Sequence, residues 1–447
     1  MIKFKKIVSR CFHFVSLLSI FLGNSFLNTA FGQPNPLKPV FDFKGRYIVA
    51  VSDADMVASA YLNNQLGEPQ GKDALSLIKL DKPVNQLKAI AIEVSNSVMG
   101  PPSSVAVSPD GRYAIVIETR GQRPTGKDDP LLSDLPVGKT ITVVNLTEPD
   151  QPKITQQFKG VEGPLSVTFN IEGSLVAITY APKDTSQHPL VIYQFSNGIL
   201  TKPSMPDIPG YTKGNVLNGA VFHPVNNTLV LLNATKSLLC FFSLLQAGND
   251  ITLTKWGNFV QVDEVPFKAC FTPSGRFLVV NSMYPGSVRG SVTSIGLATG
   301  NSNEKTPVHQ IVSRVLAGVL PEGLTMSPDA HWIVTTNLEQ STQPFEKPEQ
   351  GFFSSLTLIR LSAETGLLER VGDFTFNGIL PESVVFDNTS QYIAVATFDH
   401  YDVNRRGGSI DFWRLTKDYF DATRILLVKT DYSVPVTRGI HSMVIVR

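Results

Sequence analysis

The chain is poor in charge and in cysteine, and these shortages exclude several classes of protein. Only 17% of its 447 residues are charged, and the formal net charge is +1. Binding to nucleic acid or to anionic lipid needs a basic surface, so we expect neither partner. Three cysteines are too few for a disulfide framework, so the fold must depend on its hydrophobic core. Cys240 and Cys270 lie in apolar strands, where we expect buried free thiols, with a disulfide as the alternative.

Familiar catalytic and metal-binding motifs are also missing. The sequence contains no paired CxxC, no HExxH, no GxSxG and no P-loop. Their absence excludes the common zinc sites, the α/β-hydrolase nucleophile and the P-loop phosphate site. Apolar runs with a helical period are missing as well, which favours an all-β fold. We therefore predict no cofactor from motifs, and a divalent cation remains open through the acidic residues considered below.

One long apolar run stands at the N-terminus. A basic stretch precedes residues 11–23, which are too few to span a bilayer comfortably. Ala30 and Gly32 occupy the −3 and −1 positions of a small-residue cleavage site. We expect a signal peptide at 1–32 and a single mature domain at 33–447, periplasmic or secreted. An uncleaved anchor is the alternative, and no membrane span is expected after cleavage.

A recurring phrase is the most informative feature that is present. A turn built on Pro, Asp, Asn or Gly is followed seven times by a hydrophobic strand. The last turn residues of the seven copies are Gly45, Gly111, Gly173, Asn227, Gly275, Ala330 and Ser390. The steps between them are 66, 62, 54, 48, 55 and 60 residues. A repeat of this length, made of short strands, is typical of the blades of a β-propeller.

Each repeat is expected to form one blade of four antiparallel strands. In the first complete repeat these are residues 103–108, 112–118, 140–146 and 152–158. The N-terminal unit lacks a first strand, whereas the chain ends in a lone first strand at 439–446. We therefore predict an all-β, seven-bladed β-propeller in which the C-terminal strand joins the N-terminal strands in the last blade. Such a closure pairs the edge of the N-terminal strands that would otherwise be open.

The phrases SPDGRYAIV, TPSGRFLVV and SPDAHWIVT resemble the YVTN-type (WD40/YVTN repeat-like) repeats of seven-bladed propellers. They are also similar to the lactonase-like propellers of the 6-phosphogluconolactonase type. The resemblance covers the whole mature chain and implies the propeller fold and an activity on lactones. Its motifs mark turns and strands. Members of that family usually carry a His- and Arg-containing phrase before the turn, where this chain has LPEG and LPES instead.

Polar residues at the start of the first strands form the main candidate site. Alignment of the repeats places one residue per blade near the mouth of the channel: Ser103, Leu165, Asn218, Phe267, Glu322, Glu382 and His441. Glu322, Glu382 and His441 fall on consecutive blades, with Lys268 and Arg438 nearby. Converging carboxylates raise one another's pKa and can act as acid and base, or hold a divalent cation with the imidazole. The alternative is a solvated channel in which these groups bind water, backbone amides or Arg438.

The long loops between second and third strands are the other candidate, because binding sites often lie on loops of a rigid scaffold. The loop FDHYDVNRR supplies Asp399, His400, Tyr401 and Arg405. With Asn218 and Lys268 of the channel, these are the residues that we expect to bind a ligand. A solvated polar loop is the alternative.

These features favour a monomeric binding or interaction module that engages a protein, a glycan or a small molecule through its channel mouth and loops. The alternative, implied by the resemblance, is a lactonase-like hydrolase or isomerase acting on a lactone or sugar-acid derivative. In that enzyme Glu322 or Glu382 would be the base, His441 the proton shuttle and Arg438 the oxyanion partner. A redox-cofactor propeller is a third hypothesis, and no haem-attachment motif supports it.

Overall fold

Seven antiparallel sheets follow one another along the chain, and the sequence-based prediction of a seven-bladed propeller is confirmed. The computed structural model describes residues 40–99, 102–183, 186–284, 286, 288–298, 308–341, 353–401, 404 and 406–447. The predicted signal peptide lies outside the described residues. None of the described helices is long and apolar enough to cross a membrane.

The strands have the same order in every blade. Blades 1 to 6 start at β4, β8, β12, β17, β21 and β25, and blade 7 consists of β29, β1, β2 and β3. First strands are β4 (Val105–Val107), β8 (Pro164–Phe169), β12 (Leu217–Phe222), β17 (Pro266–Phe271), β21 (Pro321–Met326), β25 (Ser383–Phe386) and β29 (Ile440–Val446). Second strands are β5 (Tyr113–Ile117), β9 (Leu175–Tyr180), β13 (Thr228–Asn233), β18 (Phe277–Ser282), β22 (Trp332–Asn337), β26 (Tyr392–Thr397) and β1 (Tyr47–Ser52).

The outer strands complete the blades. Third strands are β6 (Thr140–Asn145), β10 (Leu190–Ser196), β14 (Leu238–Ala247), β19 (Arg289–Gly296), β23 (Ser354–Leu361), β27 (Gly408–Lys417) and β2 (Ala74–Lys79). Fourth strands are β7 (Lys153–Lys159), β11 (Ile199–Ser204), β15 (Asp250–Lys255), β20 (Gln310–Val319), β24 (Leu368–Phe376), β28 (Ile425–Val436) and β3 (Ala89–Glu93). The remaining short elements are β16 (Val260–Gln261), which pairs with β14, and α1 (Ala60–Asn63), η1 (Val84–Gln86) and η2 (Leu132–Asp134).

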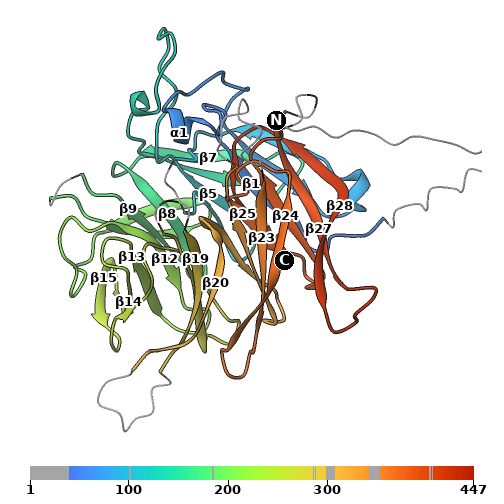
Figure 1. Ribbon diagram of the computed structural model, residues 1–447. Coiled ribbons are helices and arrows are strands. Elements are labelled where there is room, and N and C mark those ends of the chain that lie inside the picture. Colours follow the sequence, from blue (N-terminus) through green and yellow to red (C-terminus); the bar gives the residue numbers. More distant parts are fainter. Residues whose placement is uncertain are drawn as a thin grey trace, which may run out of the picture. The chain divides into compact units, whose positions relative to one another are not determined.

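The first strands form the inner rim of a closed ring. Each contacts the first strands of both neighbouring blades, from β4 round to β29, and β29 in turn contacts β4. Figure 1 colours the sheets in chain order, from the blue β1 to the red β27 and β28. Because the first strands contact one another around the ring, residues at the start of these strands are held close together.

Blade 7 is assembled from both ends of the described chain, as predicted. β29 pairs antiparallel with β1, from Tyr47 opposite Val446 to Val51 opposite Ser442. β1 continues into β2 and β3 on its other side. This closure pairs the edge of β1 that would otherwise be open.

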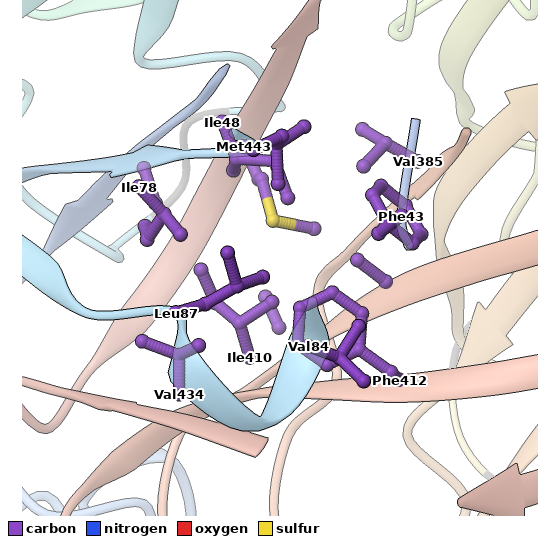
Figure 2. Close-up of a cluster of buried hydrophobic side chains, with 14 of the residues drawn as sticks. Phe43, Ile48, Ile78, Val84, Leu87, Val385, Ile410, Phe412, Val434 and Met443 are labelled. Carbon is purple, nitrogen blue, oxygen red and sulfur yellow. The ribbon is translucent and has the colours of Figure 1, made fainter. Parts of the chain in front are cut away.

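Apolar side chains fill the seam between blade 6 and blade 7 (Figure 2). Ile48 and Ile78 of blade 7 pack with Ile410 and Phe412 of blade 6, and Met443 of β29 joins them. All five side chains are buried. Burying one such side chain stabilises the fold by about 1.5–3 kcal/mol, so these contacts hold neighbouring blades together.

The β1–β2 loop, residues 53–73, has an apolar cluster of its own. Met56 and Leu66 of this loop pack with Leu135 and Phe398, which follow other second strands or lie in their loops. Inside the loop, Val57 and Leu66 are joined by a backbone hydrogen bond of 2.9 Å. The loop is therefore an ordered part of the fold, although the sequence shows it as an irregular insertion.

Candidate functional site

Four titratable side chains from consecutive blades lie at the start of the inner strands. Lys268 is on β17, Glu322 on β21 and His441 on β29, while Glu382 immediately precedes β25. We call Lys268, Glu322, Glu382 and His441 the channel cluster. Three of them were placed on neighbouring blades by the sequence repeat, and Lys268 was expected nearby.

Strained turns position the channel cluster. Val265, Leu320 and Leu380, each followed by proline, have φ values of 38°, 49° and 45°. Positive φ is uncommon outside glycine, and in a β-branched residue such as Val265 it is an outlier. Regular strand pairing is also interrupted beyond the first of these turns, where the backbone N–H of Lys268 donates instead to the Asn281 side chain at 2.7 Å. Strain of this kind is concentrated at functional sites in other proteins.

Lys268 connects the members of the channel cluster. Its Nζ donates a hydrogen bond of 3.2 Å to the backbone carbonyl of Glu382. Its charge also interacts with the carboxylates of Glu322 and Glu382 and with the imidazole of His441. Burial lowers the pKa of Lys268, and the two carboxylates oppose that shift. Lys268 is therefore the electrostatic centre of the cluster.

The two glutamates differ in their affinity for a proton. Burial raises the pKa of Glu322 to about 7, against the opposing charge of Lys268. Burial and then the charge of Glu322 hold the pKa of Glu382 well above its ordinary value. These groups titrate as a coupled set, in which burial favours the protonated form of both carboxyl groups. A pair of carboxyl groups that shares protons in this way can supply both a base and an acid.

His441 is a neutral imidazole held by two hydrogen bonds. Its Nε2 lies 2.7 Å from Oδ1 of Asn96, whose Nδ2 donates to the carbonyls of Ser52 and Val94. This fixes the amide orientation, so Nε2 carries the proton and Nδ1 accepts from Oγ of Ser104 at 3.3 Å. Burial, followed by the charge of Lys268, lowers the pKa of His441 to about 3. The geometry favours a fixed positioning side chain over a proton shuttle.

Sequence reasoning missed Tyr61, which lies on α1. Burial and then the charges of Glu382 and Glu322 raise the pKa of Tyr61 well above its usual value. The side chain is 38% exposed, and its charge interactions place it near both glutamates. Its hydroxyl donates to the carbonyl of Val98 at 3.2 Å. No sequence pattern connects Tyr61 with the glutamates, because this proximity depends on how the β1–β2 loop folds back.

Arg438 is held by the β1–β2 loop. It is 7% exposed, and its Nη2 donates to the backbone carbonyl of Glu68. Burial lowers the pKa of Arg438, and its favourable charge interactions are with Asp399 and Asp53. Asp53 interacts with Arg438 and also with Glu382, and the role of Arg438 as oxyanion partner stays a prediction.

The remaining candidate ligand-binding residues are held by the protein itself. Asn218 donates to a backbone carbonyl of blade 4 at 3.2 Å. Asp399 and His400 are nearly buried, and Oδ1 of Asp399 accepts from two backbone amides. Tyr401 is half-buried and donates to a backbone carbonyl at 3.3 Å. Arg405 lies outside the described residues.

A cavity of about 460 Å³ occupies the central channel. Residues from the inner edges of all seven blades line it, among them Ser103, Ser166, Gly219, Lys268, Leu324, Ser383 and Ser442. Lys268 is the member of the channel cluster that forms part of this lining. Pro273 and Pro328, in turns between first and second strands, line the cavity as well. It therefore extends toward the turns, whereas the sequence suggested access from the side of the loops.

Potential metal ligands gather elsewhere. Among the described residues, ligand atoms of Asp53, Asp55 and Asp73 lie within 4.8 Å of one another. Backbone amides already donate to each of these carboxylates. Burial raises the pKa of Asp53 to about 6 and that of Asp73 to about 8, and the three side chains tie the β1–β2 loop together. A cation held by Glu322, Glu382 and His441 stays a prediction.

Comparison with known proteins relates the fold to solved structures. No family model matches the chain, and no curated protein matches it in sequence. A periplasmic gluconolactonase of Pseudomonas aeruginosa is 14% identical, with 90% of this chain and 99% of that chain covered and a TM-score of 0.59. A proposed 6-phosphogluconolactonase of Bacteroides fragilis is also 14% identical, with 92% and 100% covered and a TM-score of 0.59.

The chain has the fold of the lactonase-like seven-bladed propellers. A protein of unknown function from Desulfotomaculum acetoxidans, 12% identical, also matches 90% of this chain and 99% of its own with a TM-score of 0.58. The fold implied by the sequence resemblance is therefore confirmed. Because one fold supports many functions, the activity must be argued from the residues of the channel.

Proposed function

We propose that this lactonase-like propeller hydrolyses a lactone in its central channel, next to Lys268. The observation that carries the proposal is the position of Lys268, which lines the channel cavity and interacts with Glu322 and Glu382. The gluconolactonase of the same fold supports a cyclic ester of a sugar acid as the substrate class. That protein is periplasmic, in line with the export expected from the N-terminal segment.

The first step is attack by water. The ammonium of Lys268 polarises the lactone carbonyl, and the oxygen of a water molecule bonds to the carbonyl carbon. Glu322 accepts a proton from that water, and a base with a pKa of about 7 is suited to this task at neutral pH. The negative charge that forms on the former carbonyl oxygen is stabilised by Lys268.

The second step opens the ring. The bond between the carbonyl carbon and the ring oxygen breaks, and the ring oxygen takes a proton from Glu382, which its raised pKa keeps protonated. The product is a hydroxy acid. Transfer of a proton from Glu322 to Glu382 then restores both groups. His441 takes no proton in this scheme and holds the start of β29 in position through Asn96 and Ser104.

Proton release at constant pH tests the proposal with the purified protein and a panel of aliphatic and sugar-acid γ- and δ-lactones. The wild type is expected to hydrolyse at least one of them. Removing a general base typically costs about 10²–10⁴-fold in rate, so Glu322→Gln should lower kcat/KM by that factor. Lys268→Met should also lower it strongly. Glu264→Gln, an exposed position before β17, is the matched control and should keep the wild-type rate.

The same preparation distinguishes hydrolysis from binding alone. The ordered loops above the channel also suit a binding module, which would bind a lactone or hydroxy acid in calorimetry without releasing protons. Absence of turnover across the panel, or full activity of Glu322→Gln, would contradict the hydrolase.

A further inference from the structure

The seam between blades 6 and 7 opens into a cleft beside its apolar core. The cleft has a volume of about 660 Å³ and lies outside the central channel. Its walls carry small side chains, Ser76, Ala89 and Ala91 from blade 7 and Gly408 and Ser409 from blade 6. Larger side chains on the same sheets close the seam in the cluster of Figure 2. The space therefore results from the small residues at this end of the seam.

Arg438 brings one unsatisfied hydrogen-bond donor to this cleft. It is 93% buried, and within the described part of the chain its Nε has no hydrogen-bond partner. Two further lining residues, Ser76 and Gln70, each have a buried oxygen without a partner among the same residues. A buried donor left without a partner costs about 1–3 kcal/mol, so the unpaired Nε of Arg438 favours an acceptor at this end of the cleft.

Three positive charges gather around the cleft. Arg406 is exposed, lines the cleft together with Arg438 and interacts with it unfavourably. Arg123 adds a third positive charge nearby, while Asp399 and Asp53 oppose them, and Asp55 interacts with Arg123. Burial raises the pKa of Asp53 to about 6, so part of that negative charge is lost in weakly acidic solution. An anion between the guanidinium groups of Arg438 and Arg406 would relieve their repulsion.

We infer that this cleft is an anion-binding site, in which Arg438 and Arg406 bind the carboxylate or phosphate group of a small ligand. Guanidinium groups suit both anions, because their planar N–H donors match two oxygens at once. The hydroxyl of Ser76 adds a further donor. The site is separate from the channel cluster, because neither glutamate nor Lys268 lines the cleft.

Thermal unfolding of the full protein tests this inference. Inorganic phosphate and acetate are titrated separately at an ionic strength kept constant with sodium chloride. A saturable rise in Tm with phosphate, acetate or both is expected, since an anion that binds the folded state stabilises it. A response to phosphate alone assigns a phosphate group, and a response to acetate alone assigns a carboxylate.

Two variants and a control locate the effect. Arg406→Gln changes an exposed residue and is expected to weaken binding by about tenfold or more. Arg438→Gln should abolish it, and if that variant does not fold, Arg406→Gln decides. Arg424→Gln, in an exposed hairpin, should bind like the wild type, and lactone hydrolysis should be unchanged in Arg406→Gln. The inference is overturned if neither anion gives a saturable rise, or if Arg406→Gln and Arg424→Gln respond alike.

Discussion

At the scale of single residues, the channel cluster is governed by a conflict between burial and charge. Burial disfavours the ammonium of Lys268 and the carboxylates of Glu322 and Glu382, while their opposite charges favour ionisation. The outcome for Glu322 is a pKa of about 7, close to the pH at which a base must work. The same shift affects stability, so it can be measured without a substrate.

We expect the contribution of Glu322 to stability to fall as the pH rises from about 4.5 to 7. Glu322 has a higher pKa when folded than when unfolded, so its contribution is fully present below the unfolded value and is lost as the pH rises through the folded value. The loss is on the order of 2 kcal/mol. Urea unfolding at pH 5 and pH 8 measures it. Between pH 5 and pH 8 the wild type should lose stability relative to Glu322→Gln by about this amount, and an identical pH dependence of the two proteins would contradict the shift.

At the scale of structural elements, the turns before the inner strands are strained and lie next to the channel cluster. Val265 has a φ of 38° and stands three residues before Lys268. A residue other than glycine in this conformation costs about 1–2 kcal/mol, and natural proteins retain such strain where geometry serves a function. A substitution that relieves the strain should therefore preserve or raise stability and lower activity.

Val265→Gly is expected to be at least as stable as the wild type, because glycine adopts positive φ freely. It should also lower kcat for lactone hydrolysis, since Lys268 is held less firmly. Val225→Gly is the control: Val225 is exposed and has no positive φ, so its loss should cost about 0.5–1 kcal/mol and leave activity unchanged. Chemical denaturation and initial rates give both values. If Val265→Gly loses more stability than Val225→Gly, the turn is not strained.

Elements formed by local signals were predictable from the sequence, and those formed by long-range contacts were not. Turn and strand alternate within each repeat, so the boundaries of β5 and β6 follow from nearby residues. The sequence shows a Leu-Pro pair at both Leu320 and Leu380. The positive φ values of these two leucines are seen only in the structure. Tyr61 could not be predicted, because the β1–β2 loop carries no repeat to align it.

At the scale of the whole molecule, the spacing of the repeats was enough to predict the closed ring and the shared blade. The same spacing placed Glu322, Glu382 and His441 on consecutive blades, and the structure brings them to Lys268. It could not place Arg438. Arg438 immediately precedes β29, and its side chain lies between blades 6 and 7. Alignment of the repeats predicts how far along its strand a residue lies. It does not predict between which two blades the side chain packs.

Closure of the ring depends on a close backbone contact at Gly439. Its carbonyl accepts from the N–H of Asp53 at 2.9 Å, and a Cβ atom at this position would lie 1.7 Å from the carbonyl oxygen of Asp53. Gly439→Ala is therefore expected to separate β29 from β1 and to destabilise the protein severely in chemical denaturation. Gly71→Ala is the matched control: it has the same φ of +84° with open space around it, and should cost about 1–2 kcal/mol. Equal losses in the two variants would show that backbone conformation alone, and not the contact that closes the ring, requires glycine at position 439.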